Sequence, residues 1–152
     1  MIIKMDIANR KTAEEVLAIQ IPSYKIEAKL IGSYDIPPLK DTIDTLQRCE
    51  ECFYGYYSKN KLCGALAMKI ENQEMDIHRL IVDPDYFRKG IAQSLLSYAE
   101  RQEGIKRINV STGSKNTPAV RFYEKNGFQK VKEVIVSEQI SLTFFEKNVI
   151  HE

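Results

Sequence analysis

Two neighbouring segments in the middle of the chain differ in their pattern of apolar residues. Residues 76–82 are rich in branched apolar side chains and predict a β-strand, which the tripeptide Asp83-Pro84-Asp85 ends. Further on, apolar residues recur at the spacing of one helix face: Ile91, Leu95, Leu96 and Ala99. A short basic stretch with one glycine, residues 87–92, joins the two segments. The sequence therefore predicts a strand, a tight turn and a helix in direct succession.

A helix that begins in such a turn can bind an anion. Its first backbone N–H groups have no partner within the helix, and the positive end of the helix dipole lies at the same point. Arg88 and Lys89, directly before Gly90, add positive charge there, which indicates a phosphate or pyrophosphate ligand. The spacing fits neither a P-loop, which needs two glycines followed by Lys and Ser or Thr, nor a dinucleotide fingerprint, which needs three glycines.

The N-terminal part predicts one strand and a helical region. Residues 2–7 predict the strand, and Thr12 begins a capping-box pattern for a helix. Pro22 is expected to end or interrupt that helix. A second helical piece is predicted from about residue 23 to residue 30, closed by Gly32.

The next part predicts a connection and then a hairpin. Residues 36–39 are expected to be extended because each of two prolines biases its predecessor away from helix. Asp41 is predicted to cap a short helix. Residues 53–57 and 62–70 predict two strands of a hairpin, which a further turn connects to the strand at 76–82, so three neighbouring strands are expected to be antiparallel.

The C-terminal part predicts alternating strands and one more helix. Residues 107–111 predict a strand, which should lie parallel to the strand at 76–82 because a helix connects the two. Thr117 and Pro118 predict a helix start. Strands at about 129–136 and 139–145 complete the pattern.

Composition and charge fit a single soluble domain. The 152 residues contain 43% hydrophobic and 28% charged residues, with a formal net charge of +1. This balance does not indicate nucleic-acid binding through bulk charge. No apolar run approaches the roughly 20 residues of a membrane span, and no signal peptide is recognisable, so we expect a cytoplasmic protein without membrane contact.

The cysteines do not predict a metal site. Cys49 and Cys52 have the C-x-x-C spacing that zinc and redox sites use, but a structural zinc site needs four ligands and Cys63 stands alone. We expect partly buried, reduced thiols at the end of a helix and the start of a strand.

Two stretches resemble signatures of the GNAT acetyltransferase superfamily. The family's coenzyme A loop reads Gln or Arg, two variable residues, Gly, one variable residue, then Gly or Ala; Gly90 and Ala92 match its last two positions, and Phe87 stands at its first. A second signature, with Asn, Ala, an aromatic-Tyr pair and Gly-Phe, is matched in full by Asn116, Ala119, Phe122, Tyr123, Gly127 and Phe128. The resemblance covers residues 75–128 well and the N-terminal third by its pattern of elements.

Membership of this family implies an α/β (α+β) fold with a mixed, mostly antiparallel, splayed central sheet flanked by helices. The whole chain, 1–152, would form one acetyltransferase domain that holds acetyl-coenzyme A between diverging central strands and needs no metal. The pyrophosphate is expected at the turn residues Arg88, Lys89, Gly90, Ile91 and Ala92. Backbone groups of Leu80, Ile81 and Val82 are expected to bind the thioester and pantetheine amides, with Asn116 near the coenzyme arm.

Acetyl transfer to an amine needs a proton donor for the thiolate and a proton acceptor for the amine. The resemblance places Tyr123 at the family's general-acid position, and a phenol with a pKa near 10 can protonate a thiolate whose conjugate acid has a pKa of roughly 8.5 to 10. Its neighbour Phe122 is expected in the core. Asp76 and His78, on one face of a strand, are the candidate bases: some family members carry a Glu near the first, and histidine has the better-matched pKa.

The resemblance assigns the acceptor to the N-terminal helices and adjoining loops, here Tyr24, Glu27, Tyr34 and residues 36–39. The leading hypothesis is an N-acetyltransferase that transfers the acetyl group of acetyl-coenzyme A to a primary amine of a small molecule or protein in a ternary complex. The alternative is a non-catalytic acyl-coenzyme A sensor or interaction module on the same fold. A nucleotide-binding regulator fits less well because both nucleotide motifs are absent. Phe144 and Phe145 on the last strand suit either a homodimer face or the core.

Overall fold

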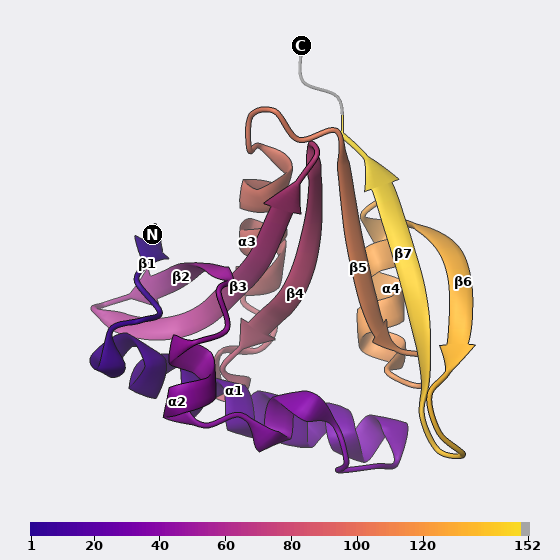
Figure 1. The fold of residues 1–152 in the computed structure, drawn as a ribbon, viewed down its shortest axis with the longest axis horizontal. Helices are drawn as coiled ribbons and strands as arrows, with labels where there is room; N and C mark the ends of the chain where they lie inside the picture. The colour runs from indigo at the N-terminus through magenta and orange to yellow at the C-terminus, as the bar shows by residue number, and fades with distance from the viewer. Residues whose placement is uncertain (150–152) are drawn as a thin grey trace.

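The computed structural model describes residues 1–149. Within them the helices are α1 (Arg10–Ile31), η1 (Pro37–Lys40), α2 (Ile43–Gln47), η2 (Pro84–Tyr86), α3 (Ile91–Glu100) and α4 (Thr117–Lys125). The strands are β1 (Ile2–Met5), β2 (Cys52–Ser58), β3 (Lys61–Glu71), β4 (Glu74–Val82), β5 (Arg107–Gly113), β6 (Gln129–Ile135) and β7 (Ser141–Asn148). They form one sheet in the order β1-β2-β3-β4-β5-β7-β6, and only β4 and β5 are parallel neighbours (Figure 1).

The sheet opens between its two parallel strands. Residues 74–77 of β4 pair with residues 107–110 of β5, whereas β3 stays paired with β4 as far as Val82. Beyond residue 77 the two strands separate, and the opening faces α1 (Figure 1). The predicted fold class, a mixed and mostly antiparallel splayed sheet flanked by helices, is confirmed, as are the hairpin and the parallel crossover.

A β-bulge in β4 decides which side chains face which layer. Ala67 of β3 lies opposite Arg79 and Met68 opposite Ile77, so His78 is the extra residue. Ile77 packs in the core cluster with α3, whereas Ile81, four residues later, packs in the cluster with α1. Without the bulge, the period of two would place both on one face.

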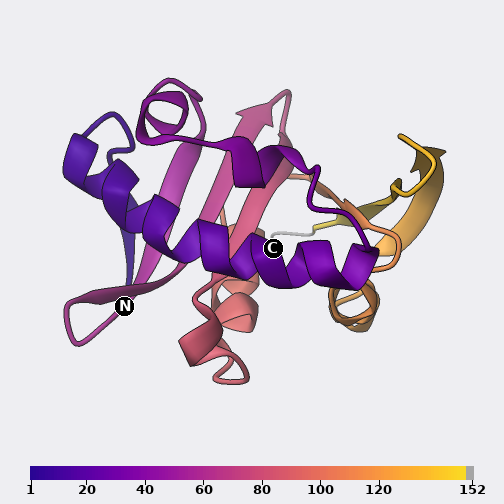
Figure 2. The ribbon, with the colours of Figure 1, turned by 90° about the horizontal axis from the view of Figure 1, so that it is seen from below.

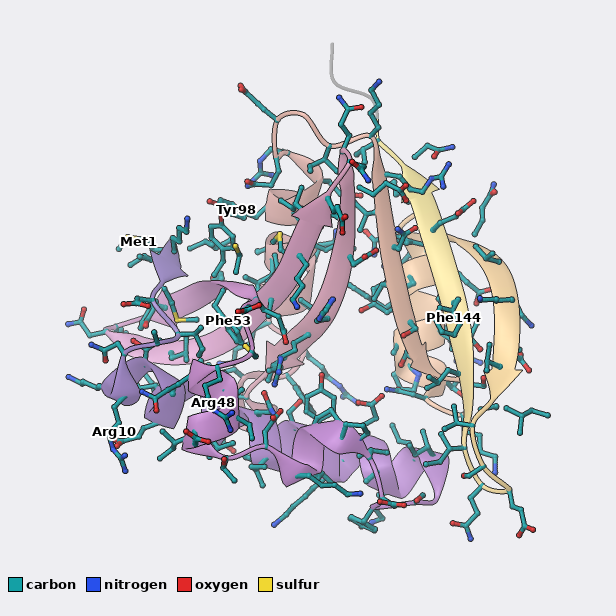
Figure 3. All side chains as sticks on the ribbon, viewed as in Figure 1. Met1, Arg10, Arg48, Phe53, Tyr98 and Phe144 are labelled. Carbon is teal, nitrogen blue, oxygen red and sulfur yellow. The ribbon has the colours of Figure 1, made fainter. Side chains whose placement is uncertain are left out.

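Helices cover both faces of the sheet. Leu95, Leu96 and Ala99 of α3 pack with Met68, Met75 and Ile108 on one face. Val16 and Ile19 of α1 pack with Leu46, Phe53 and Ile81 on the other; Phe53 is fully buried there (Figure 3). Seen from below, α1 crosses the molecule under the separated ends of β4 and β5 (Figure 2).

The predicted break at Pro22 is wrong, because α1 is one continuous helix. Pro22 removes a backbone hydrogen bond to Ala18, but both residues lie on an exposed side of the helix. Buried residues on both sides of the proline, Val16 and Ala28 among them, keep the helix on the sheet. The N-cap is Asn9, whose side chain accepts from the backbone N–H of Thr12, and Gly32 closes the helix with φ of 81° as expected.

Other boundaries also differ from the sequence prediction. Of the segment expected to be extended at residues 36–39, residue 36 is extended, but residues 37–39 belong to η1, since proline fits the first helical position well. The N-cap of α2 is Thr42, which forms a capping box with Thr45, and not Asp41. The N-cap of α4 is Asn116, one residue before Thr117.

The burial of the cysteines and of the last aromatic pair can be compared with the sequence predictions. Cys49 is half-buried, but Cys52, expected to be partly buried, is exposed; both are free thiols. Phe145 belongs to the core with 2% exposure, while Phe144 is half-buried beneath the Lys132 ammonium. Among residues 1–149, no helix is long and apolar enough to cross a membrane, and no cluster of three His, Cys, Asp or Glu residues suits a metal ion.

Candidate functional site

The turn before α3 has the geometry that an anion site needs. Arg88 and Gly90 both adopt left-handed backbone angles, with φ of 64° and 76°, and Gly90 is the N-cap of α3. No side chain among residues 1–149 caps this helix end, so its first N–H groups remain available. A Cβ atom built on Gly90 would meet no described atom within 4 Å, so the turn borders open space.

A groove of about 630 Å³, the long groove, extends from this turn to the opening between β4 and β5. Its walls come from α1, β4, the turn with the start of α3, and α4. It is lined by Ser23, Tyr24, Ile26, Glu27, Leu30, Leu80, Val82, Tyr86, Phe87, Arg88, Gly90, Ile91, Ala92, Gln93, Asn116, Pro118, Ala119, Phe122, Tyr123 and Lys125.

Most of the residues predicted to hold the coenzyme meet in the long groove, and two do not. Lys89 is absent from its lining; the Lys89 Nζ atom lies 5.6 Å from the centre of the Tyr86 ring. The side chain of Ile81 is fully buried on the α1 side of the sheet. The backbone of β4 after residue 77 has no strand partner toward β5 within the described chain, so its polar groups on that edge are free to bind a ligand.

A second cavity of about 300 Å³, the inner cavity, lies behind the long groove. Apolar side chains from both separated strands and from the loops after α1 and β6 form much of its wall. Six described residues line both the long groove and the inner cavity, and therefore mark where the two spaces meet: Tyr24, Glu27, Leu80, Asn116, Ala119 and Tyr123.

Tyr123 lies at this junction and belongs to the core at the same time. It is 5% exposed, and its ring packs against Phe128 and Phe145 with centroid distances of 5.5 and 5.8 Å. Phe122, expected to be the core residue of the pair, is only half-buried and lines the long groove. Burial, with a contribution from the nearby Glu27 charge, raises the pKa of Tyr123, so its hydroxyl stays protonated at physiological pH.

Glu27 is the carboxylate at the junction. Thr112 Oγ1 donates a hydrogen bond of 3.4 Å to Glu27 Oε1, across 85 residues of sequence. Burial raises the pKa of Glu27, while hydrogen bonds from Asn116, Thr112 and the Gly113 backbone oppose that rise. Tyr24, one helical turn earlier, is partly buried, and burial together with the Glu27 charge raises the pKa of its hydroxyl.

A buried ion network beside the inner cavity was not expected from the sequence. Arg79 Nε lies 2.9 Å from Glu51 Oε1, and Arg79 Nη1 lies 2.6 Å from Asp41 Oδ2 and 3.0 Å from Gln20 Oε1. These groups join β4 to α1, to the start of β2 and to the loop before α2. Arg79, Glu51 and Asp41, together with His78, line a side cavity of about 390 Å³ that shares a wall with the inner cavity. The arginine inside the apolar run of β4 was the available signal, because a buried charge needs partners.

The two predicted bases occupy different places. His78 lines the inner and side cavities, and its Nδ1 lies 3.7 Å from Glu51 Oε2. Asp76 is exposed at the closed end of the sheet, where Asn109 Nδ2 donates to it at 2.9 Å, and it lines neither the long groove nor the inner or side cavity. Tyr34, predicted to contact the acceptor, is 60% exposed and also absent from those linings. The structure does not bring these last two residues to Tyr123.

A sequence model of the acetyltransferase (GNAT) family matches residues 13–128, about three quarters of the chain. The chain belongs to the GNAT acetyltransferase family. The "UPF0157 protein YqkA" of Bacillus subtilis is 39% identical over 134 residues, which cover 88% of this chain and 39% of that protein. The spermidine N(1)-acetyltransferase of Thermoplasma acidophilum is 28% identical over 94 residues, which cover 60% of this chain and 58% of that enzyme. The chain thus spans only two to three fifths of the length of these relatives.

The GNAT fold is also evident in solved structures. The PaiA N-acetyltransferase of Thermoplasma acidophilum, solved in complex with coenzyme A, superposes with a TM-score of 0.78 at 22% identity and covers 97% of this chain and 98% of its own. In this GNAT chain the long groove has the features that coenzyme A requires: an uncapped helix start for the pyrophosphate, Arg88 beside it, and a free strand edge for the pantetheine amides.

Proposed function

We propose that this chain is an N-acetyltransferase that transfers the acetyl group of acetyl-coenzyme A to a primary amine in a ternary complex. The observation that carries the proposal is the junction of the long groove and the inner cavity at Tyr123. A coenzyme in the groove and an amine in the cavity would meet there without leaving the protein, so positioning supplies much of the acceleration.

Each wall of the junction has a task in this reaction. The free edge of β4 near Leu80 donates hydrogen bonds to the thioester oxygen, where negative charge develops. The protonated Tyr123 hydroxyl faces the developing thiolate and donates its hydrogen bond to the sulfur. The amine nitrogen attacks the carbonyl carbon, the C–S bond breaks, and the two leaving protons end on the protein and on the thiol.

The charges in the cavities favour a cationic acceptor. Ionisable residues of the inner and side cavities include four carboxylates, on Glu27, Asp35, Asp41 and Glu51, against the single guanidinium of Arg79 and the imidazole of His78. The long groove shares Glu27 with the inner cavity but adds the cations of Arg88 and Lys125, which suit a polyphosphate. A primary ammonium group therefore fits the inner cavity, in agreement with the polyamine named for one relative.

Binding and turnover test this proposal separately. Isothermal titration should show binding of coenzyme A and acetyl-coenzyme A, and a thiol-detecting dye should report acceptor-dependent turnover across a panel of primary amines. Tyr123→Phe should lower kcat by roughly 10²- to 10⁴-fold, the usual contribution of a positioned proton donor, with coenzyme A binding retained. Tyr98→Phe is the matched control. Tyr98 lies on α3, away from the opening, and its ring centroid is 5.0 Å from that of Tyr54 (Figure 3).

Two results would reject the enzyme assignment. If titration with coenzyme A and with acetyl-coenzyme A releases no heat, the protein does not bind the proposed co-substrate. Coenzyme binding without turnover on any amine would favour the alternative, an acyl-coenzyme A sensor on the same fold.

A further inference from the structure

We infer that Glu27 is the general base: its carboxylate accepts the proton that the acceptor ammonium must lose before attack, an inference that rests on the proposed function. Among the described residues, Glu27 is the one carboxylate that lines both the long groove and the inner cavity. It comes from α1, whereas the two bases predicted from the sequence lie on β4.

Groups from a different part of the chain position this carboxylate. Thr112 Oγ1 donates a hydrogen bond to Glu27 Oε1 at 3.4 Å, and the Gly113 backbone and the Asn116 side chain act on the same group by opposing the rise in its pKa that burial causes. The Asn116 Oδ1 atom is the cap of α4, accepting from the Ala119 N–H at 3.3 Å, so Nδ2 is the part of this side chain that can serve Glu27. The carboxylate is therefore fixed at the junction while an oxygen lone pair remains for an ammonium.

Close packing of α1 on β5 makes this contact possible. A Cβ atom on Gly113 would lie 2.8 Å from Ile31 Cγ2, so the absence of a side chain there lets the C-terminal half of α1 approach the strand end. Ile31 follows Glu27 by one helical turn, so the same approach brings Glu27 to Thr112.

The surroundings favour proton acceptance at neutral pH. Burial raises the pKa of Glu27 above that of an exposed glutamate, which makes its ionised form a stronger base, while Thr112, Asn116 and the Gly113 backbone favour the ionised form. The titratable and charged groups that share its two cavities are Tyr24 on its own helix, Asp35 in the following loop, His78 and Arg79 on β4, Tyr86 on η2, Arg88 before α3, and Tyr123 and Lys125 on α4.

The protons balance with Glu27 as base. An ammonium gives its first proton to the Glu27 carboxylate, and the free amine attacks the thioester carbon. When the C–S bond breaks, the nitrogen gives up its second proton, and the Tyr123 hydroxyl passes one proton to the sulfur as it takes that proton in return. The products are the amide, the free thiol and a protonated Glu27, which releases its proton to water.

The pH dependence of kcat tests this role, with saturating acetyl-coenzyme A and an amine found in the panel. For the wild type we expect kcat to rise with pH and then reach a plateau above the pKa of Glu27. Glu27→Gln should lower kcat at neutral pH by roughly 10²- to 10⁴-fold and replace the plateau by a continued rise, because only amine that is already unprotonated can react. Thr112→Val removes a hydrogen bond to the ionised form, raises the pKa of Glu27 and should move the acid limb to higher pH.

Folding and charge are controlled separately. Glu14→Gln makes the same change on the exposed side of α1 and should leave the pH profile unaltered. Coenzyme A titration of Glu27→Gln should match the wild type, and its free energy of unfolding at neutral pH should be equal or higher, because ionising a carboxyl whose pKa burial raises costs stability there.

The outcomes separate this inference from the function beneath it. If the wild type acetylates an amine and Glu27→Gln keeps the wild-type kcat and plateau, Glu27 is not the base although the enzyme assignment stands. The same conclusion follows if His78→Gln or Asp76→Asn removes the plateau instead. A wild type that turns over no amine overturns both claims.

Discussion

Replacing Arg79 by methionine should destabilise the protein strongly. The Arg79 side chain is 11% exposed, and its partners Glu51 and Asp41 are 8% and 18% exposed. Methionine keeps much of the side-chain volume but leaves two nearly buried carboxylates without their cation. Removing one partner of a buried ion network costs about 3–5 kcal/mol, so we expect a loss in that range out of a total stability of about 5–15 kcal/mol.

Urea unfolding at neutral pH measures this loss, with Arg48→Met as the matched control. Arg48 also contacts a carboxylate, Asp44, at 2.6 Å, but both side chains are about 70% exposed. That pair should contribute no more than about 0.5 kcal/mol. If the two variants have the same m-value, the difference between their denaturation midpoints reports a difference in stability and not a change in the unfolded state.

Two further measurements sharpen the argument. The deficit of Arg79→Met should shrink toward acid pH, because protonation of Asp41 removes one uncompensated charge. The triple variant with Asp41→Asn and Glu51→Gln should recover part of the loss, because it leaves no buried charge unpaired. A loss for Arg79→Met within about 0.5 kcal/mol of the Arg48→Met control would refute the reasoning, since the buried network would then contribute no more than a surface pair.

Three other predictions follow from single contacts. Gly90→Ala should lower the free energy of unfolding by about 1–2 kcal/mol because alanine is strained at the φ of 76°, and it should also weaken coenzyme A binding. Gly104→Ala, at a φ of 80°, should lower stability by the same amount but leave coenzyme A binding unchanged. Calorimetry measures the stabilities, and titration with coenzyme A measures the binding. Gly113→Ala should lower the free energy of unfolding in urea by about 1–3 kcal/mol, because the new Cβ would lie 2.8 Å from Ile31 Cγ2. An unchanged stability would mean that α1 can shift away from β5 at little cost. Burial alone would raise the pKa of Asp41, but hydrogen bonds and the Arg79 charge outweigh it and lower the pKa, so its stabilisation is present at neutral pH and lost as pH falls below about 4; Asp41→Asn should therefore be destabilising at pH 7 and indistinguishable from wild type in strong acid.

Local chemistry in the sequence was sufficient for the turn and for the helix ends near it. Gly90 predicted a tight turn before a helix, and the helix carries its apolar residues on one face as the spacing required. Thr117 and Pro118 predicted the start of α4 correctly to within one residue. Such features depend on backbone sterics and on side chains a few positions apart, so a reader of the sequence can evaluate them.

Long-range packing overrode local signals elsewhere. Pro22 is a strong helix breaker, yet burial on both sides of it keeps α1 whole. The bulge at His78 reverses the in-and-out alternation of β4, and this reversal turns Arg79 toward Glu51 and Asp41. The spacing of apolar residues within β4 does not predict this bulge, because a bulge is defined by the register against the partner strand.

The sequence by itself determined the family, the glycine turn before α3 and the presence of Tyr123 in a helix that follows a parallel strand. Only the tertiary structure decided which side chains meet that tyrosine. Glu27 and Thr112 are 85 residues apart and touch because α1 crosses beneath two strands that diverge, while Asp76, close to the opening in sequence, stays at the closed end. The physical reason is that the position of a helix over a sheet follows from the fit of whole packed faces, which no short stretch of sequence contains.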